Sequence, residues 1–143
     1  MSSVGDVDML RRRSEGFMSH AREALRRGEY DLACFFAEQA LQLRLKALIF
    51  RVLGVLPRTH GVRELLGVVS SALEEIGRAD LAEEVSKLAR EFRTQLKVLD
   101  EAYIASRYLA REYAAEDASE SVDLAERVLR LVDRIEGAVF RDK

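Results

Sequence analysis

Polar side chains recur at helical spacing in the otherwise largely apolar segment 30–53: Glu38, Gln39, Gln42 and Lys46. An α-helix turns by about 100° per residue, so these side chains would share one sector roughly 100° wide. Carboxylate and amide oxygens accept hydrogen bonds and a lysine ammonium donates them, so the stripe could hold a base, a ribose or a phosphate. The alternative is a stripe that faces water and is stabilised by polar pairs one turn apart.

Apolar side chains cover most of the remaining surface of this predicted helix, and Arg44 and Arg51 fall nearly opposite the polar stripe. A helix with two apolar faces packs against two neighbours, and its polar side chains must then find water or protein partners. We therefore expect residues 30–53 to form the central helix, with a cleft along the stripe.

The other elements are predicted from apolar spacing and from capping residues. We expect helices over residues 6–27 and 30–53, a third from an N-cap at Thr59 to Gly77, a fourth from an N-cap at Asp80 to Leu99, and a last one over residues 119–140. Residues 100–118 are less regular. The predicted fold is all-α: an antiparallel up-down bundle of four long helices plus an extra short helical segment, in one domain over residues 1–143.

Composition excludes several classes of protein. With 48% hydrophobic and 34% charged residues the chain is globular. Its net charge of −2 does not indicate an extended surface for binding nucleic acid. The longest uncharged run, residues 65–73, is far shorter than a membrane span. The single cysteine, Cys34, has no intrachain disulfide partner and fits a buried apolar position. We expect a cytoplasmic protein with no cofactor and no metal site.

Lysines make up only four of the 23 basic residues, and asparagine is absent. Few thermolabile residues and many charges suit a thermophile. A GC-rich genome gives the same arginine bias, so both explanations stay open.

Several short motifs resemble the HEPN domain (higher eukaryotes and prokaryotes nucleotide-binding) when they are taken in order. They cover nearly the whole chain: Gln39-Ala40, Lys46-Ala47-Leu48, Pro57, Thr59-His60 and Arg107-Tyr108. Two positions depart from the family pattern, since the family often has Glu in place of Gln42 and Pro in place of Leu109.

The resemblance implies an up-down helical bundle that is often a homodimer. It also implies partnership with a small nucleotidyltransferase, in some cases as a toxin–antitoxin pair. In many catalytic relatives, which are ribonucleases, an Arg is followed by four to six intervening residues and then by a His, near the start of the last helix. This chain has only His20 and His60, and the spacing of Arg13 and His20 falls in the first helix, where we interpret it as chance. We predict no catalytic residue.

Six residues are predicted to bind ligand: Glu38, Gln42, Lys46, His60, Arg107 and Tyr108. The alternatives are a local capping or packing role for His60, an ion pair for Arg107, and a half-buried structural role for Tyr108, as for Tyr103 and Tyr113.

Three hypotheses follow. The first is a binding module for a nucleotide or nucleic-acid ligand that works with a nucleotidyltransferase. The second is a non-catalytic homodimer or assembly protein. The third is a ribonuclease that uses Arg107 with a tyrosine.

Overall fold

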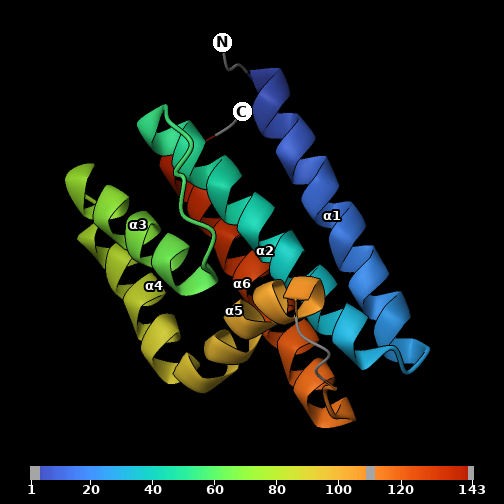
Figure 1. Cartoon of the computed structure of the whole chain (residues 1–143). Helices are drawn as coiled ribbons and strands as arrows, with labels where there is room; N and C mark the ends of the chain where they lie inside the picture. The colour runs from blue at the N-terminus through green and yellow to red at the C-terminus, as the bar shows by residue number, and fades with distance from the viewer. Residues whose placement is uncertain (1–3, 109–111, 142–143) are drawn as a thin grey trace.

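The computed structural model describes residues 4–108 and 112–141, and the side chains of residues 5–104 and 112–141. Six helices and no strand are present in these ranges. They are α1 Val4–Arg26, α2 Tyr30–Leu53, α3 Val62–Glu75, α4 Ala79–Glu91, α5 Arg93–Tyr108 and α6 Ala115–Phe140 (Figure 1). The all-α prediction is confirmed.

Helix α2 lies at the centre of the bundle. It packs against α1, α6, α5 and α3, with α1 beside it as an antiparallel hairpin and α6 behind it in Figure 1. Helices α3 and α4 form a second hairpin. Below this hairpin in Figure 1, α5 runs at an angle to the other helices. None of the described helices is long and apolar enough to cross a membrane.

Small side chains allow α1 and α2 to pack closely. Ala33, Ala37 and Ala40 of α2 are fully buried, as is Ala21 of α1. Ser14 of α1 is buried with them and donates a 2.7 Å hydrogen bond to the backbone oxygen of Ala40. Such residues let two helix backbones approach, because little side-chain volume separates them.

The central helix has the predicted bounds, whereas its neighbours are shifted. The predicted start of the third helix at Thr59 is wrong, because α3 begins at Val62. Thr59 instead bonds the carboxylate of Glu64, and the backbone N–H of Val62 donates to Asp100 of α5 at 2.7 Å. The N-cap of α4 is Arg78 rather than Asp80, which forms an ion pair with Arg78 at 3.0 Å.

The region 80–118 differs most from expectation. The predicted helix to Leu99 is two helices, because the chain turns at Phe92 between α4 and α5. Residues 100–108 are helical, and α6 begins at Ala115, four residues before the predicted start. Buried contacts of Leu96, Leu99 and Ala102 stabilise α5 over α2. These long-range contacts are invisible in local sequence spacing.

A buried ion cluster joins α2 to α6. Arg44, whose side chain is 5% exposed, bonds Glu136 and lies 3.0 Å from Asp133. Arg51 donates to the other carboxylate oxygen of Glu136 at 2.7 Å and covers the ring of Phe140, 4.1 Å from its centroid. These arginines, which fall opposite the polar stripe, are therefore neutralised within the chain.

Substitution of Glu136 by Ala should be strongly destabilising. It leaves Arg44 charged and buried without its main partner, which typically costs about 3–5 kcal/mol. Asp133→Ala is the matched control: its side chain is 65% exposed, so its loss should cost no more than about 1 kcal/mol. Urea denaturation gives both free energies of unfolding. Equal losses in the two variants would contradict this role for Glu136.

Candidate functional site

The polar stripe of α2 is buried inside the protein and does not face water. Glu38 is completely buried and Gln42 is 6% exposed. The two carboxylate oxygens of Glu38 accept one hydrogen bond each, from Gln39 at 2.7 Å and from Gln42 at 2.8 Å. The alternative of a water-facing stripe is therefore wrong at its centre.

Lys46 and His60 extend this hydrogen-bonded line. The Nζ of Lys46 donates to Oε1 of Gln42 at 3.2 Å, and Nδ1 of His60 lies 3.2 Å from each of these atoms. Depending on its tautomer, His60 accepts from Lys46 or donates to Gln42. Four of the six predicted ligand residues thus form one network between α2 and the segment before α3.

Burial controls the charge of this network. Desolvation raises the pKa of Glu38 to about 7. The amide donors Gln39 and Gln42 oppose this rise because they favour the carboxylate, and the charge of Asp100 adds to it. Desolvation lowers the pKa of Lys46, partly offset by the charge of Glu38. The network therefore holds or releases a proton near neutral pH.

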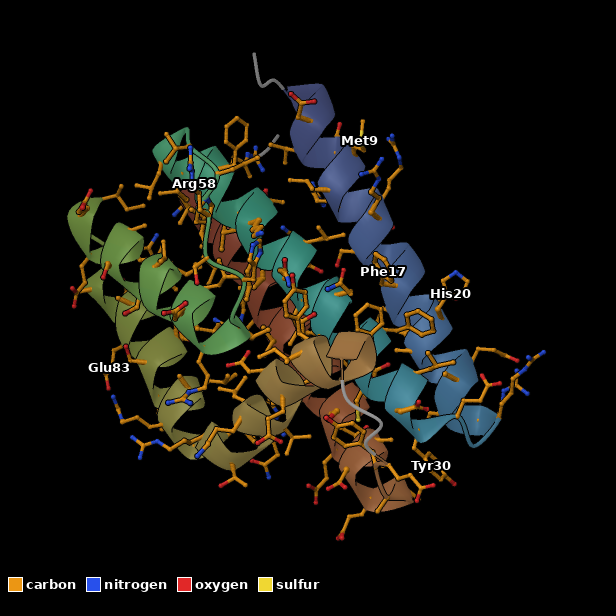
Figure 2. All side chains as sticks on the ribbon, in the orientation of Figure 1. Met9, Phe17, His20, Tyr30, Arg58 and Glu83 are labelled. Atoms are coloured by element: carbon orange, nitrogen blue, oxygen red, sulfur yellow. The ribbon has the colours of Figure 1, made fainter. Side chains whose placement is uncertain are left out.

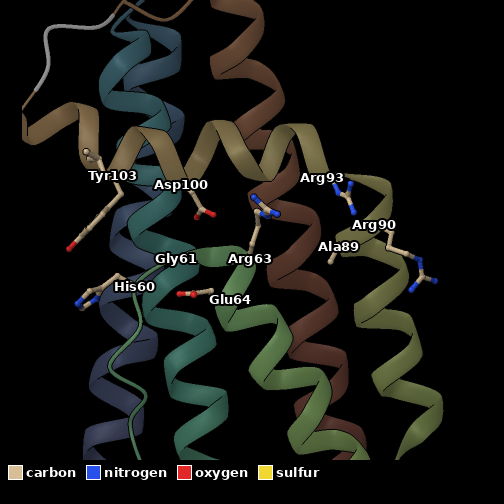
Figure 3. A pocket seen from close by; sticks show the side chains of 10 residues that line it. His60, Gly61, Arg63, Glu64, Ala89, Arg90, Arg93, Asp100 and Tyr103 are labelled. Carbon is tan, nitrogen blue, oxygen red and sulfur yellow. The ribbon is translucent and has the colours of Figure 1, made fainter.

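A hollow of about 720 Å³ adjoins the network at His60. Figure 3 shows its side chains coming from the start of α3, the end of α4, and α5. The rings of His60 and Tyr103 stack at one end, 5.8 Å between centroids and 24° from parallel. Arg93 lies at the other end, with Arg63 and Asp100 between them.

The arginines of the hollow differ in their partners. Arg90 also lines the hollow, but it forms an ion pair with Glu83 at 3.0 Å. Arg63 and Arg93 extend toward the space between α3 and α5 (Figure 3), and neither forms an ion pair with another described residue. These two guanidinium groups are therefore available to an anion.

Asp100 connects the fold to the hollow. Its carboxylate caps α3 through Val62, and burial raises its pKa against the hydrogen bonds it accepts from the backbone of Val62 and Arg63. Aromatic faces can stack on a base, guanidinium groups bind phosphate, and carboxylates accept from ribose hydroxyls. The lining of the hollow offers all three kinds of group.

The remaining predicted residues lie at the end of α5. Arg107 and Tyr108 belong to its last turn, but their side chains lie outside the described part of the structure, as does Leu109. Their predicted roles stay predictions. Sequence reasoning missed Asp100, Arg63 and Arg93, and left Tyr103 undecided. For Asp100 and Tyr103 helical spacing was the available signal, because residues 100, 103 and 104 share one face once α5 is recognised as a helix.

Other candidate groups lie elsewhere. His20 sits on the outer side of α1 (Figure 2), its ring 5.7 Å from that of Phe36. Arg13 lies on the same helix, far along the chain from the hollow. Cys34 is buried, with its Sγ 3.7 Å from Oγ of Ser121. The described residues contain no group of three or more His, Cys, Asp or Glu side chains suited to a metal ion.

Fold and site together define an all-α bundle built around one buried polar stripe. The chain belongs to the HEPN domain family, whose sequence model matches residues 7–135.

Two solved structures are similar to it. TT1696 from Thermus thermophilus is 29% identical, with a TM-score of 0.67 over 90% of this chain and 96% of that one. ST0689, an archaeal HEPN homologue, is 26% identical, with a TM-score of 0.59 over 89% of this chain and 94% of that one. The comparison with curated proteins gives no match.

Glu38 should make stability depend on pH. Its pKa is 4.5 as a free group and about 7 in the fold, so the folded chain holds the proton more tightly than the unfolded chain. This contribution is fully present below pH 4.5 and is lost as pH rises through 7. The loss amounts to at most about 3 kcal/mol.

Urea denaturation of the native chain and of Glu38→Gln across this range measures the effect. The free energy of unfolding of the native chain, relative to that of Glu38→Gln, should fall as the pH rises from 4.5 through 7. Glu15→Gln, at an exposed position of α1, is the matched control. Parallel curves for the native chain and Glu38→Gln would show that Glu38 does not retain the proton.

Proposed function

We propose that this HEPN chain is a binding module that holds a nucleotide, free or within an RNA strand, in the hollow between α3 and α5. One observation carries the proposal: an aromatic pair and two arginines without ion-pair partners among the described residues line the same hollow. The hollow of about 720 Å³ falls within the usual size of small-molecule sites.

The base would lie at the aromatic end. His60 is exposed and Tyr103 half-buried, so a ring can reach the stack from solvent. The buried network restrains His60 through Lys46 and Gln42. A restrained ring loses little further freedom when a ligand binds, and this raises affinity.

The phosphate would lie nearer the arginine end. A guanidinium group binds phosphate through two parallel hydrogen bonds, which fix its position as well as adding energy. Arg63 follows the capped start of α3, where Asp100 fixes the backbone. Glu64 and Asp100 would repel a second phosphate group close to them but accept hydrogen bonds from a ribose. A nucleoside monophosphate therefore fits the charges better than a triphosphate.

A separate small nucleotidyltransferase is the proposed partner, and a toxin–antitoxin pair is the proposed setting. The support is membership of the HEPN family together with the resemblance on which this partnership rests. A binding module that presents a nucleotide or RNA end to such an enzyme needs no catalytic group of its own. This agrees with the absence of an Arg and His at ribonuclease spacing before the last helix.

Nucleotide binding should raise the thermal midpoint of the chain as ligand concentration rises. AMP, GMP, ATP and a short RNA are the probes. Arg63→Ala should weaken binding about tenfold or more, because a charge-assisted contact contributes about 1.5–3 kcal/mol.

Arg90→Ala is the matched control, because Arg90 is held by Glu83, and it should bind like the native chain. Arg107→Ala separately tests the end of α5. If no probe shifts the thermal midpoint, or if Arg63→Ala and Arg90→Ala bind the probes equally well, the hollow is not the site.

Coexpression tests the partner. A small nucleotidyltransferase from the same genome should coelute with this chain in size-exclusion chromatography and should change its affinity for the nucleotide measured by calorimetry. If the two proteins coelute but the affinity for the nucleotide does not change, the enzyme binds this chain without influencing its ligand site. The absence of a complex with each such enzyme of the genome would contradict the partnership.

A further inference from the structure

The contacts of His60 decide which hydrogen-bonding group it offers to a ligand in the hollow. A neutral imidazole carries one proton, on either Nδ1 or Nε2, and the nitrogen without it is an acceptor. Nδ1 of His60 lies 3.2 Å from Nζ of Lys46 and 3.2 Å from Oε1 of Gln42. Nε2 has no hydrogen-bond partner among the described residues, and His60 is exposed. A ligand therefore meets Nε2, whose character is set by what Nδ1 binds.

Gln42 is held with its amide oxygen toward His60. Its Nε2 donates to the carboxyl group of Glu38 at 2.8 Å, while its Oε1 accepts from Lys46 at 3.2 Å. If the amide were turned over, its NH₂ group would face the ammonium group of Lys46, and two donors would meet. Glu38 and Gln42 are buried, so such a mismatch would be costly. The orientation of Gln42 is thus set from both of its ends.

Lys46 selects between the two tautomers of His60. A lysine ammonium group has three N–H donors and no acceptor. A proton on Nδ1 of His60 could be donated to Gln42, but it would lie beside this cation, 3.2 Å away, and would compete with it for the same oxygen. A lone pair on Nδ1 instead accepts a charge-assisted hydrogen bond from Lys46. The charge of Glu38 helps Lys46 to keep its proton.

We propose that Lys46 is a positioning residue that keeps the proton of His60 on Nε2, so that His60 presents an N–H donor to the ligand. Lys46 itself does not line the hollow and acts through His60. The inference rests on the proposed function for its ligand but not for the tautomer, which is a property of the free chain. The group recognised is a hydrogen-bond acceptor, either a phosphate oxygen or an acceptor atom of the base. A ligand with only N–H donors at this point is disfavoured, because two donors would face each other.

Nuclear magnetic resonance of the free chain labelled with ¹⁵N tests the tautomer. The chain has only two histidines, so the spectrum of His20→Gln assigns the ring signals of His60. At about pH 8, where an ordinary imidazole is neutral, two-bond correlations between the ring protons on carbon and the ring nitrogens show which nitrogen carries the proton. In the native chain His60 should carry it on Nε2. In Lys46→Met the proton should move to Nδ1, where Oε1 of Gln42 accepts it.

His20 is the internal control, because its ring lies on α1 beside Phe36 and its tautomer should be the same in the native chain and in Lys46→Met. Lys46→Arg should leave the proton of His60 on Nε2, because a guanidinium group also only donates. A native chain with the proton on Nδ1 would overturn the proposal, and this measurement needs no variant at position 46. A Lys46→Met chain that is folded by circular dichroism and still carries the proton on Nε2 would overturn it as well.

Calorimetry identifies the acceptor, with inorganic phosphate, adenosine and AMP as probes. Lys46→Met should weaken the binding of AMP about tenfold, because an acceptor on His60 then faces an acceptor on the ligand. Binding of inorganic phosphate falls with it if the acceptor is a phosphate oxygen, and binding of adenosine falls with it if the acceptor belongs to the base. Lys87→Met, at an exposed position of α4, is the control for the lost charge and should bind AMP like the native chain.

An unchanged affinity for AMP in a Lys46→Met chain whose tautomer has switched would overturn the recognition of an acceptor. If no probe binds the native chain, the proposed function and this recognition both fail, whereas the tautomer is decided by the spectra alone.

Discussion

The burial of α2 is the constraint on which the rest of the structure depends. Its apolar residues occupy so much of its surface that neighbours must cover it on every side. Coverage on every side also encloses the few polar groups it carries, and each must then be paired within the protein. Toward α6, Arg44 and Arg51 are paired with Glu136. On the opposite side, Glu38 accepts from two amides of its own helix.

Helix α5 both covers α2 and lines the candidate site. By crossing the bundle it covers α2 with Leu96 and Leu99, and it brings Asp100 to the start of α3. The same crossing leaves the hollow between α3 and α5, where Tyr103 stacks on His60. Core packing and the candidate site therefore share one element. A substitution that moves α5 would disturb both, and a surface substitution in the hollow would disturb only the site.

The candidate site combines an exposed hollow with a buried polar network beside it. The hollow offers exposed groups such as His60. The network that adjoins it contains Glu38, whose burial raises its pKa to about 7.

The sequence alone determined the all-α fold, the central helix at residues 30–53, and the stripe that carries Glu38, Gln42 and Lys46. These features follow from helical periodicity, which is local and therefore readable. Only the tertiary structure decided that the stripe is buried, that the chain turns at Phe92, and that Asp100 rather than Thr59 caps α3. Those outcomes depend on contacts between residues far apart in the chain. No local pattern encodes them, because the same apolar spacing is compatible with one long helix or with two that pack at an angle.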